Sequence, residues 1–125
     1  MKDQINFSVV VPLYNKETTI IRAISSILNQ THPHFEIIIV NDGSTDESLR
    51  NVRIIKDNRI RIITQENQGL SIARNVGIEH SNHEWVAFID ADDAWEPRFL
   101  EVIRNMMSKE PNCGVYGTSY TIINR

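Results

Sequence analysis

Three carboxylates lie within four residues in the run Asp90-Ala91-Asp92-Asp93. Like charges this close repel one another, so a cluster without a partner raises some of the carboxyl pKa values and costs stability. A bound divalent cation removes that cost, and Mg²⁺ and Mn²⁺ prefer hard oxygen ligands such as carboxylates and substrate phosphates. The run therefore predicts a site for Mn²⁺ or Mg²⁺ together with a phosphate-bearing ligand. The alternative is a turn that caps the helix beginning near Pro97, and for Asp93 this alternative stays open.

Three further residues have types suited to binding a nucleotide. Asp42 ends a buried apolar segment, and its carboxylate can accept the N–H group of a nucleobase. Tyr14 offers an aromatic face, and the guanidinium of Arg74 can hold a diphosphate through two hydrogen bonds. Each also has a purely structural interpretation: a tight turn for Asp42, packing on a helix for Tyr14, and a solvent-facing position for Arg74.

Apolar segments predict the strands that position these residues. Four strands are expected, over Phe7–Val11, Glu36–Val40, Arg59–Thr64 and Trp85–Ile89, and Val115–Ile123 is a fifth candidate. The first two are continuous runs rich in β-branched residues, which are typical of strands covered on both faces. Arg59–Thr64 alternates between polar and apolar residues, which is typical of an edge strand.

Helical patterns separate the expected strands. They cover about residues 17–30, a segment beginning at Ser44, residues 69–80 and a segment beginning near Pro97. Asn15 is the expected N-cap of the first helix, and Ser44 with Glu47 has the spacing of a capping box. Ala73 and Gly77 are four residues apart, so a small-residue face would let the third helix pack close to the sheet.

The alternation of strands and helices predicts an α/β domain with a mainly parallel sheet and helices on both faces. An edge-like third strand and a central first strand predict the strand order 3-2-1-4, with a ligand-binding switch point between strands one and four. The polar segments after the four strands would then meet at one edge of the sheet: Pro12–Asn15, Asn41–Ser44, Gln65–Gly69 and Asp90–Asp93. The sequence predicts one binding site there.

Length and composition narrow the function classes. The 125 residues predict a single domain, 1–125, and 41% hydrophobic content fits an ordinary core. The net charge of -3 argues against nucleic acid as the main partner, and the single Cys113 fits a reducing cytoplasm. No GxGxxG or GxxxxGK[ST] motif is present. The four histidines, His32, His34, His80 and His83, have no metal-ligand spacing and are expected on the surface.

Four motifs occur in a fixed order along the chain: Val9–Asn15, Val40–Asp46, Gly69–Asn75 and Phe88–Asp93. Each motif alone is only moderately specific, but together they resemble the family 2 glycosyltransferases of the GT-A fold along essentially the whole chain. The resemblance implies inverting transfer of a sugar from a nucleoside diphosphate sugar, with uracil the expected base, to an acceptor hydroxyl. In a longer parent protein the acceptor would be a glycan or a lipid-linked sugar, reached in the cytoplasm or at the inner face of a membrane.

The resemblance also assigns site residues. Those expected to bind the nucleotide sugar are Pro12, Tyr14, Asp42, Arg74, Asp90 and Ala91. Asp42 would hold the base, and Arg74 would help to hold the donor. Asp92 would be the direct metal ligand of an Asp-x-Asp motif, and Asp90 would lie against the ribose or in the metal shell. Asp93 extends the motif, so the assignment of the ligand within the run stays open.

The family's general base would lie beyond Arg125, in an acceptor-binding half. The chain alone is therefore expected to bind the donor with little or no transfer, and Glu66 is the first residue to test if transfer occurs. Two other function classes remain. One is a nucleotide-sugar-binding domain without turnover. The other is a Mg²⁺-dependent phosphoacceptor signalling domain, which needs a lysine at a later strand end that Val115–Ile123 does not offer.

Overall fold

The structure is a computed structural model that describes residues 4–123. Strands and helices alternate as expected: β1 (Phe7–Leu13), α1 (Ile20–Leu28), β2 (Phe35–Asp42), α2 (Ser48–Ile54), β3 (Ile60–Gln65), α3 (Leu70–Glu79), β4 (Trp85–Phe88) and α4 (Phe99–Lys109). The strands form one sheet in the order β3-β2-β1-β4, and all three neighbouring pairs are parallel. The predicted α/β class and strand order are confirmed.

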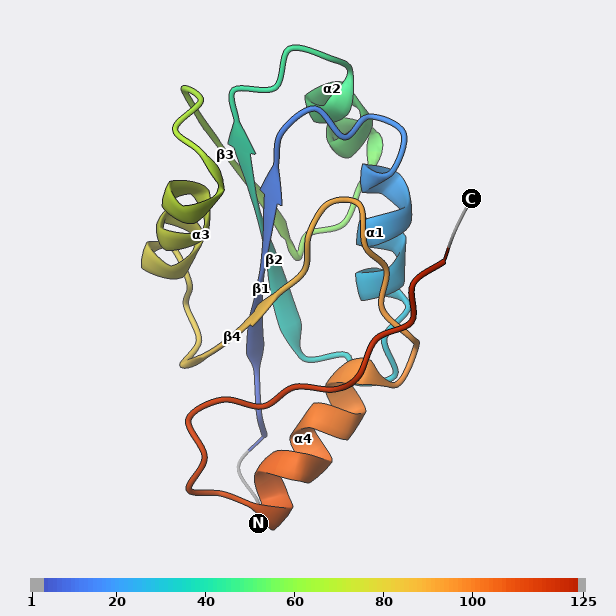
Figure 1. The fold of residues 1–125 in the computed structure, drawn as a ribbon, viewed down its shortest axis with the longest axis vertical. Coiled ribbons are helices and arrows are strands. Elements are labelled where there is room, and N and C mark those ends of the chain that lie inside the picture. The colour runs from blue at the N-terminus through green and yellow to red at the C-terminus, as the bar shows by residue number, and fades with distance from the viewer. Residues whose placement is uncertain (1–3, 124–125) are drawn as a thin grey trace.

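The sheet lies between α3 on one face and α1, α2 and α4 on the other (Figure 1), and an apolar layer covers each face. Alternate residues of β1 and β2, among them Val9 and Ile37, pack with α1, α2 and α4 in the larger core on one face. Ile38 and Val40 of β2 pack against α3 on the other face. Both central strands are buried on both faces, which explains their unbroken apolar sequences.

Helix α3 approaches the sheet closely because its inner face carries small residues. Ala73 is fully buried, and a Cβ atom added to Gly77 would lie 2.2 Å from Cγ1 of Val10. Only glycine fits at this point without displacing the side chain of Val10. The close approach predicted from the spacing of Ala73 and Gly77 is confirmed.

Two predicted helix starts are wrong. Helix α1 begins at Ile20, so Asn15 is not its N-cap but lies in the preceding loop with a positive φ of 48°. Helix α2 begins at Ser48, and its N-cap is Glu47 without a side-chain capping bond. The expected capping box between Ser44 and Glu47 does not form, because the side chain of Ser44 bonds to the loop that follows β1.

Two further expectations are wrong. The candidate fifth strand, Val115–Ile123, has no regular secondary structure, and Val115 is 89% exposed. His32 was expected on the surface but is buried, where its Nε2 lies 2.9 Å from the carbonyl oxygen of Ile5 and its ring meets the edge of Phe7. Within residues 4–123, none of the helices has the length and apolar character required to span a membrane.

Candidate functional site

A pocket of about 490 Å³ lies at the carboxyl ends of the strands. Its lining consists of Pro12, Leu13, Tyr14, Lys16, Asp42, Asn67, Gly69, Leu70, Ala73, Asp90, Ala91 and Asp92. The structure thus brings together six of the residues predicted to form the site. Arg74 is outside this lining, but its Nη2 atom lies 3.0 Å from Oδ1 of Asp90. The polar segments after all four strands meet at one edge of the sheet, as the topology predicted.

The acidic run forms a short turn after β4, and contacts with α1 hold it in place. The backbone N–H of Asp93 donates to the carbonyl of Asp90 at 3.0 Å, which closes the turn. Nη2 of Arg22, on α1, donates to the carbonyl of Asp92 at 2.7 Å. The N–H of Trp95, just past the run, donates to Oγ of Ser26, also on α1, at 3.1 Å. The turn is therefore anchored at the sheet and at α1.

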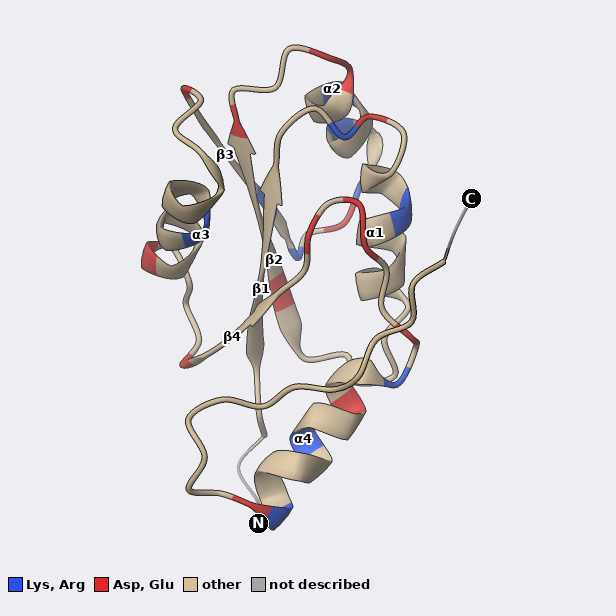
Figure 2. Cartoon of the chain, viewed as in Figure 1, with Lys and Arg blue, Asp and Glu red and all other residues tan. Residues whose placement is uncertain are grey.

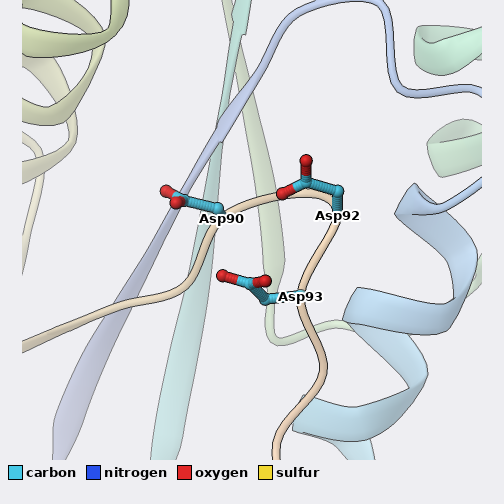
Figure 3. Close-up of side chains that lie close together, drawn as sticks. All are labelled: Asp90, Asp92 and Asp93. Carbon is cyan, nitrogen blue, oxygen red and sulfur yellow. The ribbon is translucent and has the colours of Figure 1, made fainter. Parts of the chain in front are cut away.

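The three carboxylates of the turn, those of Asp90, Asp92 and Asp93, form one cluster (Figure 3). Each offers an oxygen atom, and these atoms all lie within 4.8 Å of one another. Burial raises the pKa of Asp93, and repulsion from the charges of Asp90 and Asp92 raises it further. Clustered hard oxygen donors fit Mg²⁺ or Mn²⁺, which would neutralise this repulsion.

Two cationic side chains lie against the cluster. Arg74 pairs with Asp90, and Nζ of Lys16 lies 3.1 Å from Oδ2 of Asp92. Figure 2 shows the acidic turn beside basic positions on α1 and on the loop that precedes it. All four side chains are about 40–50% exposed, so each pair is partly screened by water. The sequence interpretation paired the acidic run with a metal and did not identify Lys16.

Asp42 organises the loop that follows β3. Its side chain is buried and accepts the backbone N–H groups of Gln68 at 2.8 Å and Gly69 at 3.0 Å. It also accepts the side-chain amides of Gln65 at 2.9 Å and Asn67 at 3.3 Å. A carboxylate has about four lone-pair sites, so these four donors occupy its capacity. Asp42 thus fixes the loop that carries Asn67 and Gly69 to the pocket.

The loops after β1 and β2 are also bonded to each other. Oδ1 of Asn15 accepts the backbone N–H of Thr45 at 2.7 Å, and Oγ of Ser44 accepts that of Asn15 at 3.1 Å. Gly43 has a φ of +74°, and a Cβ atom there would lie 2.7 Å from the backbone nitrogen of Asn67. A side chain at this position would push away the loop after β3, which carries Asn67. Glycine therefore allows the loops after β2 and β3 to pack together.

The sequence interpretation missed several pocket residues. Asn67 and Gly69 belong to the polar segment after β3, but no role was given to them. Leu70 opens α3 and is half exposed at the pocket. For Lys16 the available signal was its position directly after Pro12–Asn15, at the carboxyl end of β1. Its pairing with Asp92 could not be predicted, because Asp92 lies in the loop after β4, far away in the sequence.

A second, more open hollow of about 700 Å³ lies along α2. Its lining is Asp46, Glu47, Leu49, Arg50, Arg53, Ile54 and Lys56, which all come from α2 and its flanks. It brings together no residues from different strand ends. The candidate site is therefore the pocket lined by Asp90, Ala91 and Asp92.

Residues 8–124 match the profile described as Glycosyl transferase family 2. The chain belongs to glycosyltransferase family 2. The match includes all four motifs and every residue of the pocket, so the resemblance inferred from the sequence is confirmed.

Relatives of this family 2 chain include two bacterial proteins with informative names. The putative glycosyltransferase EpsH of Bacillus subtilis is 49% identical over 75% of this chain and 28% of its own length. The UDP-Glc:alpha-D-GlcNAc-diphosphoundecaprenol beta-1,3-glucosyltransferase WfgD of Escherichia coli is 37% identical over 94% of this chain and 46% of its own length. The chain thus spans less than half the length of these relatives.

Solved structures of glycosyltransferases share its GT-A fold. TarS of S. aureus, residues 1–349 in complex with UDP, matches with a TM-score of 0.77 and 31% identity over 84% of this chain and 32% of its own. The mannosyltransferase PcManGT of Pyrobaculum calidifontis, in complex with GDP-Man and Mn²⁺, matches with a TM-score of 0.71 and 28% identity. That match covers 78% of this chain and 30% of the other.

Proposed function

We propose that this chain is the donor-binding part of an enzyme that transfers a sugar from a nucleoside diphosphate sugar to an acceptor hydroxyl, with inversion at the anomeric carbon. The observation that carries the proposal is the pocket, where the aromatic ring of Tyr14 and the carboxylates of Asp90 and Asp92 share one cavity. An aromatic face suits a nucleobase, and clustered carboxylates suit a cation bound to a diphosphate. The complexes of TarS with UDP and of PcManGT with GDP-Man and Mn²⁺ support the same donor chemistry.

The nucleoside end of the donor would lie between β1 and the loop after β3. Pro12 and Tyr14 line this part of the pocket together with Asp42. The two backbone donors to Asp42 belong to the loop itself, whereas the amides of Gln65 and Asn67 are side chains that can turn away. A base N–H group, with uracil the expected base, would replace one of these side-chain donors on Asp42. The loop would stay in place while the base is recognised.

The diphosphate end would lie at the acidic run. Asp92, with Asp90 beside it, would hold a Mn²⁺ or Mg²⁺ ion, and Ala91 would pack against the donor. When bound, the ion supplies positive charge that stabilises the diphosphate as a leaving group. Arg74 pairs with Asp90 in the structure, so its guanidinium lies where it can donate to the same diphosphate. The negative charge that develops on the diphosphate during cleavage would be stabilised by the ion and Arg74, which would already be in position.

The remaining parts of the reaction concern the acceptor. A carboxylate must take the proton of the attacking hydroxyl. The acceptor would be a glycan or a lipid-linked sugar, met in the cytoplasm or at the inner face of a membrane during polysaccharide biosynthesis. The chain by itself would then bind a nucleotide sugar without turnover. This is the nucleotide-sugar-binding alternative that the sequence left open.

Thermal unfolding with a panel of nucleoside diphosphates tests the proposal. UDP, GDP and ADP are each added in the presence of EDTA and in the presence of Mn²⁺. A ligand at 100 times its Kd adds about 2.7 kcal/mol to the unfolding free energy. We expect UDP with Mn²⁺ to stabilise the chain most, and Asp92→Asn to remove the part that depends on metal. Glu84→Gln, a change of an exposed acid outside the pocket lining, is the control. Equal stabilisation with and without metal would contradict the metal site.

A further inference from the structure

Lys16 occupies the position where a cation would interact with Asp92. Its Nζ atom lies 3.1 Å from Oδ2 of Asp92, and both side chains belong to the pocket. The contact joins the loop after β1 to the loop after β4, and both residues line the pocket. An oxygen atom engaged by an ammonium group is less available to a divalent cation, because the two positive charges repel each other.

The backbone of Lys16 is fixed independently of this ion pair. Its N–H donates to Oγ of Ser48 at 2.8 Å, and its carbonyl accepts the N–H groups of Thr19 at 3.1 Å and Ile20 at 2.9 Å. Only the flexible side chain reaches Asp92. The Nζ atom can therefore change partner by side-chain rotation, while the loop and the start of α1 keep their positions.

Charge balance indicates what that change of partner would be. In the structure Lys16 pairs with Asp92 and Arg74 pairs with Asp90, while Arg22 is bonded to the backbone of the same turn. A divalent cation at Asp92 would add two positive charges and displace the ammonium group by repulsion. A diphosphate arriving with the cation would bring negative oxygen atoms within reach of the displaced group. Lysine is a compact, mobile charge suited to such phosphate contacts.

We propose that Lys16 is an internal counter-ion that competes with the divalent cation for Asp92 before the donor binds, and then contacts the donor's diphosphate. The proposal rests on the proposed function of the pocket. It makes metal and nucleotide binding mutually supportive, because the nucleotide supplies a new partner for the group that the metal displaces. Lys16 is thus a positioning and specificity residue for the diphosphate part of the ligand.

The test compares Mn²⁺ and UDP affinities of the Lys16→Met variant with those of the parent chain. Free Mn²⁺ is followed by electron paramagnetic resonance in the absence of nucleotide, and UDP binding is measured by calorimetry at saturating Mn²⁺. Exposed ion pairs have modest strength, so we expect Mn²⁺ to bind about two- to fivefold more tightly and UDP about two- to fivefold more weakly. Both changes should shrink as ionic strength rises.

Two variants control for charge and for position. Lys16→Arg keeps the positive charge and should restore most of the parent behaviour. Lys109→Met removes a lysine at the end of α4 and should change neither affinity. A purely structural role for Lys16 would move both affinities in the same direction or not at all. Opposite signs are therefore the signature of a counter-ion that changes partner.

The outcomes separate this inference from the proposed function. If the parent chain binds Mn²⁺ and UDP but Lys16→Met binds Mn²⁺ equally or more weakly, competition at Asp92 is disproved. If Mn²⁺ binds more tightly while UDP affinity is unchanged, the diphosphate contact is disproved. If the parent chain binds neither ligand, the proposed function of the pocket fails, and the role of Lys16 fails with it.

Discussion

The carboxylate of Asp42 accepts the backbone N–H of Gly69 at 3.0 Å, so the end of β2 is bonded directly to the residue that precedes α3. Gly69 has a φ of +97°, which lets the chain turn from the loop into the helix. The same carboxylate accepts the backbone N–H of Gln68. One buried side chain therefore fixes the position of the loop before α3, which lines one side of the pocket.

We expect Asp42→Asn to lower the free energy of unfolding by about 1–3 kcal/mol, because an amide NH₂ group would face a backbone N–H in place of an accepting oxygen. UDP affinity should fall, and Mn²⁺ affinity should change little, since Asp42 lies outside the acidic cluster. Hydrogen exchange should accelerate over residues 66–70. Glu66→Gln, an exposed change in the same loop, is the matched control. A large loss of Mn²⁺ affinity would contradict this assignment.

Asp92→Asn should change the stability of the metal-free chain by less than about 0.5 kcal/mol. The substitution relieves repulsion from Asp90 and Asp93 but loses the exposed ion pair with Lys16, and exposed pairs contribute little. The bond from Arg22 goes to the backbone carbonyl and remains. Urea unfolding in EDTA measures the change. A loss of more than about 2 kcal/mol would show that the ion pair holds the turn together.

Glu36→Gln should destabilise the chain near neutral pH and have a smaller effect in acid. Burial raises the pKa of Glu36, but bonds from the backbone and side chain of Asn82 and from Ser8, with the charge of Arg61, outweigh burial and leave the pKa below its usual value. A lowered folded-state pKa stabilises the fold above the ordinary glutamate pKa. That stabilisation is lost as the pH falls through the lowered value.

Urea unfolding from pH 7 down to about pH 3 measures this dependence of Glu36→Gln. The difference from the parent chain should narrow steadily as the pH falls through the range where glutamate titrates. Glu84→Gln, an exposed change directly before β4, should show no such trend. A difference that stays constant with pH would mean that the charge of Glu36 contributes nothing to stability.

Gly77→Ala should destabilise the fold by about 1–3 kcal/mol, because the new methyl group would lie 2.2 Å from Cγ1 of Val10. In an open helix the same change would stabilise by up to about 1 kcal/mol, so the sign distinguishes a packed position from an exposed one. Thermal unfolding measures the effect. Val10→Ala combined with Gly77→Ala should cost less than the sum of the single changes, since the shorter side chain makes room. Additive costs would contradict direct contact.

The sequence alone determined the architecture of the sheet and the position of the acidic turn. Unbroken apolar runs at β1 and β2 require cover on both faces, and right-handed crossovers leave few ways to connect parallel strands. Residues that follow such strands must meet at one edge, so the sequence alone places Asp42 and Asp90 in one site. The spacing of Ala73 and Gly77 likewise determined which face of α3 meets the sheet.

Only the tertiary structure decided how the loops at that edge bind one another. Arg22 and Asp92 are 70 residues apart, and their contact depends on the path of the loop after β4 past α1 and not on a local repeat. Asn15 has the composition of an N-cap, but with its φ of 48° it binds Thr45 of the neighbouring loop, and α1 begins later. Periodicity encodes which face of a strand or helix is buried, because burial follows the regular geometry of the element. Side-chain pairs between loops follow from irregular backbone angles and from contacts across the sheet, which no spacing in the sequence specifies.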